Sequence, residues 1–283
     1  ASPTTLGKEL VNFVARMEKE LSVLSGCLAI PAKINGAVGN FNAHFVAYGE
    51  VDWLEASGNF IQALGLESNA YTTQIEPHDG FARIFDSVKR LNTIVLDLVK
   101  DMWSYVSMGY FSQKAVKTEV GSSTMPHKVN PIDFENCEGN LGIANALLEH
   151  MSAKLPISRL QRDLSDSTVQ RNIGTAFAYC VLAYKSALKG LSKCEVNRKV
   201  IENDLKDRWE LLAEPIQVVM RKNLVPNSYE KLKELTRGKG GITRVAIQKF
   251  IKGLKISDAD KKTLLSLTPA GYVGLAEKLV DGY

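Results

Sequence analysis

The stretch DGFARIFDSVKRLNTIVLDLVKDMWSYVSM, residues 79–108, decides the fold of this 283-residue chain. Along its whole length, apolar side chains recur at alternating three- and four-residue spacings. This set comprises Phe81, Ile84, Val88, Leu91, Val95, Leu98, Met102 and Tyr105. Such a seam is typical of a helix packed lengthwise in a bundle. At about 1.5 Å per residue the helix would be on the order of 45 Å long, which few compact monomeric domains need. The pattern therefore predicts an all-α, long-helix bundle.

Helical spacing continues on both sides of this stretch. We expect helices over Thr4–Leu24, from about Asp52 to Leu64, and from near Asp166 to about Leu191. The last of these is predicted to bury Val169, Ile173, Phe177, Tyr184 and Leu188. Lys33–His44 is rich in Gly and Asn, which predicts an irregular connection. No alternating strand pattern competes with these helices.

Beyond Cys194 the predicted helices are shorter. They cover Asn203–Arg221, Tyr229–Leu235, Thr243–Ile251 and Gly271–Val280, and Gly, Pro and Asn separate them. We therefore expect two domains. Residues 1–194 would form a central helical-bundle domain that carries a loop at 110–130, and residues 195–283 would form a small C-terminal helical domain.

Composition excludes several classes of protein. With 45% hydrophobic and 23% charged residues, the chain can bury a sizeable core. A formal charge of +4 without a basic stripe does not support nucleic-acid binding, and a small anionic ligand fits it better. The four cysteines show no C-x-x-C spacing, which favours reduced thiols inside a cell. No apolar run is long enough for a membrane span, and no signal peptide is recognisable, so we expect a soluble protein without membrane partners. Because a helical pattern begins directly after Pro3, we expect the chain to be a fragment of a longer protein.

The segment GSSTMPHKVNP, residues 121–131, concentrates hydroxyl, ammonium and amide groups directly before a predicted helix. Asn130 is a good N-cap and Pro131 suits the first helical position. Unpaired backbone N–H groups and the positive end of the helix dipole would then lie beside Lys128 and favour an anion. A Ser-rich loop with a solvated lysine and an ordinary cap explains the same composition, and physics alone does not decide between them.

The segment RDLSDSTVQRN, residues 162–172, contains a second group of polar side chains. Ser167 and Arg171 are four residues apart, on one face of the predicted helix, and Arg162 lies just upstream. Two arginines and a hydroxyl suit a phosphate. An exposed arginine pair beside a Ser/Asp cap is the alternative.

The segment YTTQIEPHD, residues 71–79, offers Gln74 as a polar contact. His78 invites a role as acid or base. It lies directly before the long helix, however, and we favour a surface or capping role for it.

The first of these strings resembles the signature of the fumarase and aspartase superfamily, whose members eliminate fumarate from a succinyl or related C4 group. The resemblance implies that Ser122 is the catalytic base. It also implies that Lys128 and Asn130 hold the succinyl carboxylates, with Ser123 and Val129 contacting substrate beside them.

The other two strings are similar to segments of the adenylosuccinate lyases within that superfamily, and this likeness extends over essentially the whole chain. The resemblance implies that Arg162, Ser167 and Arg171 bind the substrate's phosphate, and that Thr168, Val169 and Gln170 in the same segment also contact substrate. It adds Gln74 and Asn136 as substrate contacts. It makes Glu135 the residue that orients a catalytic histidine, although alone Glu135 is equally a carboxylate favoured at a helix start.

For function, the resemblance implies conversion of adenylosuccinate to AMP and fumarate, and the matching cleavage of the succinylated imidazole-carboxamide ribotide in purine biosynthesis. It implies a homotetramer with shared active sites and no metal or organic cofactor. The family's acid histidine lies in a Thr-His context that none of the four histidines shares; they are His44, His78, His127 and His150. We therefore expect this chain by itself to be inactive or impaired.

Two alternatives stay open. One is another lyase of the superfamily, such as an argininosuccinate lyase or a fumarase, against which the Arg162–Arg171 segment argues. The other is a non-catalytic structural relative, against which the joint presence of Ser122, Lys128, Asn130 and Glu135 argues. The expected location is the cytoplasm, or an organelle if a targeting segment has been removed.

Overall fold

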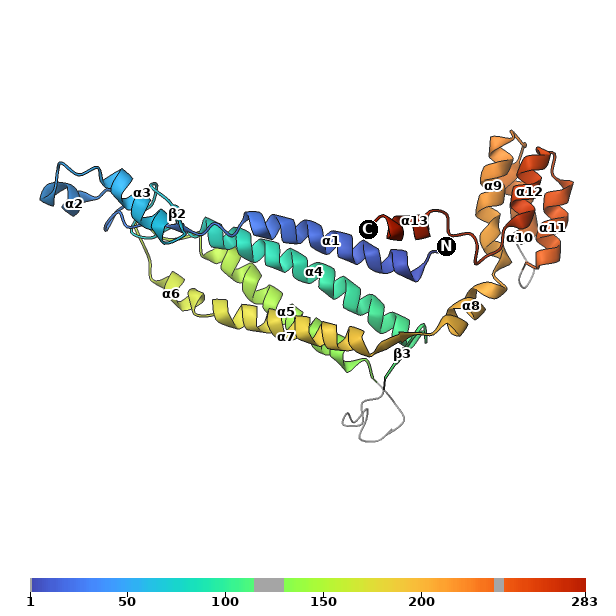
Figure 1. Cartoon of the computed structure of the whole chain (residues 1–283), viewed down its shortest axis with the longest axis horizontal. Coiled ribbons are helices and arrows are strands. Elements are labelled where there is room, and N and C mark those ends of the chain that lie inside the picture. Colours follow the sequence, from blue (N-terminus) through green and yellow to red (C-terminus); the bar gives the residue numbers. More distant parts are fainter. Residues whose placement is uncertain (1, 115–129, 237–241) are drawn as a thin grey trace. The chain divides into compact units, whose positions relative to one another are not determined.

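Helices make up most of the computed structural model, which describes residues 2–114, 130–236 and 242–283 (Figure 1). The first helices are α1 (Leu6–Gly26), α2 (Asn42–Ala47), α3 (Trp53–Ala63), α4 (Asp79–Ser107), α5 (Ile132–Lys154), α6 (Ser165–Gln170) and α7 (Ile173–Lys193). They are followed by α8 (Arg198–Lys206), the 3₁₀ helix η1 (Trp209–Leu212), α9 (Ala213–Lys222), α10 (Ser228–Thr236), α11 (Arg244–Gly253), α12 (Asp258–Ser266) and α13 (Ala276–Asp281). The predicted all-α class is confirmed.

Four short strands accompany these helices. β1 (Pro31–Ala32) pairs in parallel with β2 (Glu67–Ser68), and β3 (Phe111–Gln113) pairs with β4 (Cys194–Val196). Each is only two or three residues long, which is too short to show an alternating pattern in the sequence.

The described chain divides into two compact units. One unit holds Phe13–Ser107 and Gln113–Cys194, and the other holds Ala1–Asn12, Met108–Ser112 and Glu195–Tyr283. None of the helices described is long and apolar enough to cross a membrane.

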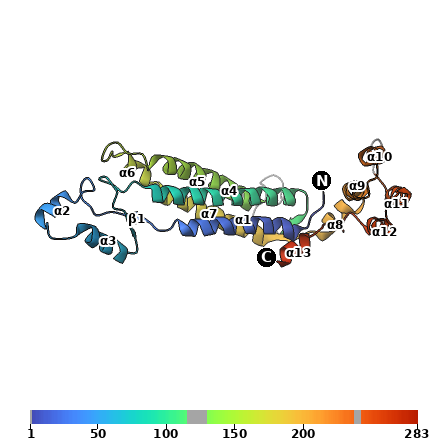
Figure 2. The same ribbon diagram turned by 90° about the horizontal axis from the view of Figure 1, so that it is seen from above.

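The long helix predicted from residue 79 is confirmed as α4, which has 29 residues. It runs alongside α5 and α7 in the first unit (Figures 1 and 2). Most of the predicted seam is buried, and the core that it forms with α5 and α7 includes Ile84, Phe85, Val88, Leu148, Met151 and Cys180. The α1 helix lies beside α4, where Arg16 forms an ion pair with Asp97 at 2.6 Å.

Four of the five residues predicted on the apolar side of the helix from Asp166 are partly buried and pack against the core, namely Val169, Ile173, Phe177 and Tyr184. Apart from Lys193, the buried residues of α7 are small: Ala176, Cys180, Ala183, Ser186, Ala187 and Gly190. Leu188, which we expected in the core, is 67% exposed. The reason is close packing on α5, because a Cβ atom added to Gly190 would lie only 2.7 Å from the ring of Phe134. On the α7 side, a small residue stands where the two helices approach closely.

The helix expected from Asp166 to Leu191 is two helices, which is a second correction. α6 ends at Gln170, and α7 begins at Ile173. The Asn172 side chain donates to the carbonyl oxygens of Thr168 and Val169, both at 3.4 Å. An asparagine that bonds to nearby backbone in this way competes with helix continuation.

The predicted helix Asn203–Arg221 is also interrupted, by the turn after α8 and by η1. Pro215 explains the break, because proline is tolerated only in the first turn of a helix, where α9 places it. The sequence pattern did not reveal α12 or α2, and α2 places His44 in a helix, not in the predicted irregular connection. In the second unit the core consists of Leu212, Ile216, Met220, Leu232, Ile242, Ile247, Ile251, Leu254 and Leu264.

Candidate active site

Ser122, Ser123, Lys128 and Val129 lie outside the described residues. The structure does describe both chain ends that flank them, up to Lys114 and from residue 130 onward.

Three predicted residues lie at the start of α5: Asn130, Glu135 and Asn136, here called the α5 group. Glu135 Oε1 accepts a hydrogen bond from Trp103 Nε1 at 3.0 Å, and Glu135 is exposed. Asn136 is also exposed, and its carbonyl oxygen accepts from Asn140 Nδ2 at 2.8 Å. The N-cap of α5 is Pro131, without a side-chain capping bond, so the prediction that Asn130 caps this helix is wrong by one position.

Six predicted residues lie together around α6: Arg162, Ser167, Thr168, Val169, Gln170 and Arg171, here called the α6 group. Arg162 Nη2 lies 3.6 Å from the Asp166 carboxylate, whose side chain is only 5% exposed. Ser167 Oγ donates to the Leu164 carbonyl at 3.1 Å. Arg162 therefore carries a buried carboxylate partner of its own, which holds the guanidinium near the start of α6.

Arg171 lies in the turn between α6 and α7, not within one long helix. It is exposed, as is Thr168, whereas Val169 packs against the bundle core. The expectation that Ser167 and Arg171 share the face of a continuous helix is thus replaced by a helix end followed by a turn.

Gln170 connects the α6 group to the start of α4. Its Nε2 lies 2.5 Å from His78 Nε2, and His78 is 8% exposed. His78 Nδ1 is buried and has no partner among the described residues. The His78 carbonyl does accept the first bond of α4, from Ala82 at 3.0 Å, but the predicted surface position is wrong.

Gln74 lies next to the segment just before α6, because its N–H donates to the Gln161 carbonyl at 3.2 Å. Lys33 holds this stretch in place. Its ammonium donates to the carbonyl oxygens of Gly36, Thr73 and Gln74 at 2.8, 2.6 and 2.9 Å. Burial lowers the pKa of Lys33.

Asp163 places a negative charge beside the α6 group. Hydrogen bonds from the Ser165 hydroxyl and amide, and then from Arg159, hold the Asp163 pKa well below its usual range. Asp163 therefore stays ionised at neutral pH and neutralises Arg159, which lies 3.1 Å away. The resemblance implies that Arg162 and Arg171 bind an anion, although Arg162 is itself paired with Asp166.

The two groups lie at opposite ends of α5 (Figure 1). The α5 group lies at its N-terminal end, and the α6 group follows its C-terminal end. α5 has 23 residues, so at about 1.5 Å per residue it spans roughly 35 Å. One small ligand cannot contact both groups of the same chain.

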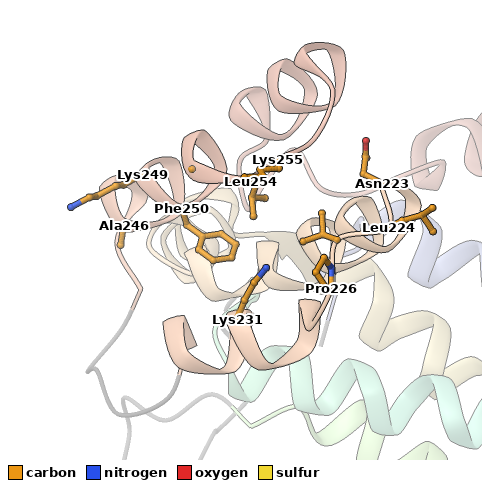
Figure 3. A pocket seen from close by; sticks show the side chains of 11 residues that line it. Asn223, Leu224, Pro226, Lys231, Ala246, Lys249, Phe250, Leu254 and Lys255 are labelled. Carbon is orange, nitrogen blue, oxygen red and sulfur yellow. The ribbon is translucent and has the colours of Figure 1, made fainter.

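A cavity of about 880 Å³ opens in the second unit, lined by residues from Asn223 to Lys231 and from Ala246 to Lys255 (Figure 3). None of the predicted site residues lines it. Phe250, Leu254 and Pro226 give it an apolar wall, and Lys231 points into it (Figure 3). In the described part of the chain, no group of three or more His, Cys, Asp or Glu residues could hold a metal ion.

Sequence reasoning missed three features of the first unit: Lys33, the His78–Gln170 contact, and the buried pair of Asp133 with Lys193. Each joins segments that are far apart in the chain. A lysine in a Gly/Asn-rich segment was the one available signal for Lys33.

Comparison with known proteins identifies a family and close relatives. A family model described as "Lyase" matches residues 1–144, and one described as "Adenylosuccinate lyase C-terminal" matches residues 158–273. The adenylosuccinate lyase of Legionella pneumophila (strain Corby) is 57% identical over 283 residues, which are 100% of this chain and 62% of the relative. That of Escherichia coli (strain K12) is 53% identical over 281 residues, which are 99% of this chain and 61% of the relative.

A solved structure is also similar: 3-carboxy-cis,cis-muconate lactonizing enzyme from Pseudomonas putida, with a TM-score of 0.73 and 20% identity. The match covers 100% of this chain and 63% of that chain. At this identity the likeness shows the fold alone.

Proposed function

Because the chain belongs to the lyase family, we propose that the protein carrying it is an adenylosuccinate lyase, which eliminates fumarate from adenylosuccinate to give AMP. The succinylated imidazole-carboxamide ribotide is its proposed second substrate. The observation that carries the proposal is the 57% sequence identity to an adenylosuccinate lyase over the whole chain. The chain spans 62% of that relative.

In the proposed reaction Ser122 removes a proton from the carbon next to a succinyl carboxylate. Negative charge then builds up on that carboxylate, and cationic and N–H donors aimed at it lower the barrier. Lys128 and Asn130 are the proposed donors, with Ser123 and Val129 beside them. A serine hydroxyl is a weak acid, so Ser122 needs nearby positive charge and exclusion of water to act as an alkoxide base.

Glu135 is proposed to orient the histidine that protonates the departing amino group. Its Oε1 accepts from Trp103 Nε1 at 3.0 Å, which leaves Oε2 for an imidazole N–H. Asn136, one residue further along α5, is proposed to contact substrate.

The α6 group is the proposed phosphate site. Arg162 and Arg171 supply the charge. The hydroxyls of Ser167 and Thr168 supply further donors, and Ser167 would exchange its bond to the Leu164 carbonyl for one to the phosphate. The pairing of Arg162 with Asp166 at 3.6 Å limits where its guanidinium can point. Gln74, held in place by Lys33, is proposed to contact the rest of the substrate.

A complete site needs more than one copy of the chain, because the two groups are separated by the length of α5. We propose a homotetramer in which the α5 group of one copy meets the α6 group of another. The exposed apolar residues of α7, which are Val181, Leu182 and Leu188 at 50, 57 and 67% exposure, suit burial between copies. The four free cysteines fit a cytoplasmic location.

The test needs a protein that also contains the part of the relatives that this chain does not span. We would join this chain to the part of the Legionella pneumophila relative that it does not match, and follow the vinyl signal of fumarate by proton NMR with adenylosuccinate. The chimaera is expected to release fumarate, and Ser122→Ala is expected to reduce the rate at least about a hundredfold.

Argininosuccinate and malate are tested as substrates in parallel. They distinguish an adenylosuccinate lyase from an argininosuccinate lyase and a fumarase. A chimaera that folds and assembles but releases fumarate from none of the three substrates would favour the non-catalytic relative. The complete Legionella enzyme serves as the positive control.

A further inference from the structure

We propose that Lys193 is a positioning residue, which ties together the two points of the chain, Lys114 and Asp133, on either side of residues 115–129. Lys193 is the last residue of α7, and 8% of it is exposed. It makes one tie through its backbone and the other through its side chain.

The backbone tie fixes the chain before residues 115–129. The Lys114 N–H donates to the Lys193 carbonyl oxygen at 2.9 Å. Because Lys193 ends α7, its carbonyl is one of those that have no partner within the helix. The bond to Lys114 satisfies that carbonyl and fixes the chain directly after β3 to the end of α7.

The side-chain tie fixes the chain after residues 115–129. Lys193 Nζ lies 2.5 Å from Asp133 Oδ2, and the two side chains are 10 and 8% exposed. The second carboxylate oxygen, Oδ1, lies 3.3 Å from Lys189 Nζ, whose side chain is 55% exposed. Loss of the ammonium would leave a buried carboxylate without its close partner, so this contact holds the first turn of α5 strongly.

The surrounding packing makes this anchor rigid. Phe134, next to Asp133, is 1% exposed and lies against Gly190, where an added Cβ would come within 2.7 Å of the ring. The α5 and α7 backbones therefore approach closely, one turn before Lys193. Neither helix can shift here without displacing the other.

The consequence for turnover rests on the proposed function. Ser122 and Lys128 lie between the two tied points, whereas the proposed phosphate site lies at the far end of α5. Loosening the tie should therefore disturb the chemical step more than substrate binding. Misplacing a reacting group by about 1 Å can cost on the order of a hundredfold in rate.

The tie can be tested on this chain without any assay of activity. Lys193→Met alone leaves the buried Asp133 carboxylate without its closer cation, although Lys189 remains 3.3 Å away, and the variant can fail to fold. The main variant is therefore Asp133→Leu with Lys193→Met, which removes both charges. Hydrogen exchange of the Lys114 amide, followed by mass spectrometry, is expected to accelerate by at least about tenfold in this variant.

The matched control is Lys89→Met with Glu149→Leu, which removes an ion pair between α4 and α5 elsewhere in the same unit. Its Lys114 exchange should equal that of the unmodified chain. Equal exchange in the Asp133/Lys193 double variant as well would overturn the tie, whatever the activity.

The chimaera described above then tests the positioning role. The Asp133/Lys193 variant is expected to lose between roughly tenfold and a hundredfold in kcat, with KM little changed. The single variant Lys193→Arg, in which Asp133 is kept, should lose less. Faster exchange with an unchanged kcat would reduce Lys193 to a structural role. If the unmodified chimaera makes no fumarate, the proposed function fails, while the exchange measurement still decides the tie.

Discussion

Asn92 Nδ2 lies 3.3 Å from Cys180 Sγ, so an amide and a thiol meet inside the helix bundle. Asn92 is completely buried; it also donates to Asn145 Oδ1 at 2.8 Å and accepts a hydrogen bond from the Tyr184 hydroxyl. Burial raises the pKa of both Cys180 and Tyr184, which therefore keep their protons at neutral pH. One polar network thus joins α4, α5 and α7 within an apolar core.

Replacing Asn92 with Leu is expected to destabilise the chain. Each buried partner left without a hydrogen bond costs about 1–3 kcal/mol in the free energy of unfolding. The urea midpoint of unfolding should fall accordingly. Asn140→Ala, at a residue that bonds within α5, should change stability by less than about 0.5 kcal/mol. Equal midpoints for the two variants would contradict a structural role for the network.

Two glycines of α7 should respond oppositely to alanine. At Gly190 the added methyl would overlap the Phe134 ring, and overpacking of this kind costs about 1–3 kcal/mol. At Gly174 nothing lies within 4 Å of the added Cβ, so alanine should stabilise the helix by about 0.5–1 kcal/mol. Thermal unfolding of both variants measures the difference, and a stabilising Gly190→Ala would show that the α5–α7 contact is looser than described.

Arg171→Gln tests the phosphate site in the chimaera. Hydrogen bonds to charged groups contribute about 1.5–3 kcal/mol, so KM for adenylosuccinate is expected to rise roughly tenfold to a hundredfold. The dephosphorylated substrate should be affected far less. Arg159→Gln is the control, since Arg159 is paired with Asp163, and it should leave KM nearly unchanged. A similar effect on both substrates would argue against phosphate binding by Arg171.

The pH dependence of stability should reveal the lowered pKa of Asp260. Lys222, then Asn223 and Ser257, hold the Asp260 pKa at about 2, below the unfolded value of about 3.9. A lowered folded pKa stabilises the protein above the unfolded pKa, and the effect is lost as the pH falls through the folded one. The stability difference between the unmodified chain and Asp260→Asn should therefore be constant near neutrality and shrink between about pH 4 and pH 2. A difference that does not change with pH would show that this pKa is not lowered.

Residues 79–108 could be predicted from the sequence because their apolar spacing, repeated over eight side chains, fits only a long packed helix. The split between α6 and α7 could not, because the decisive contacts are made by one asparagine side chain with nearby carbonyls. Leu188 was placed wrongly for another reason. Hydrophobicity favours large apolar residues in a core, whereas close packing of α5 on α7 requires small ones.

The candidate site shows the same limit. Arg162, Ser167 and Arg171 could be grouped because they lie within one short stretch of sequence. His78 and Gln170 are 92 residues apart, and no local pattern connects them. Asp133 and Lys193 were missed because a charged residue in a helix is expected at the surface unless its partner is known.

The separation of the two groups along α5 also has a genetic consequence. In the proposed assembly, no single copy of the chain holds a whole site. A copy altered at Glu135 and another altered at Arg171 would each be defective alone, yet mixed oligomers of the two would contain some sites with both residues intact. Two non-functional alleles could then restore growth together, and the unit on which selection acts at this site would be the assembly instead of the single polypeptide.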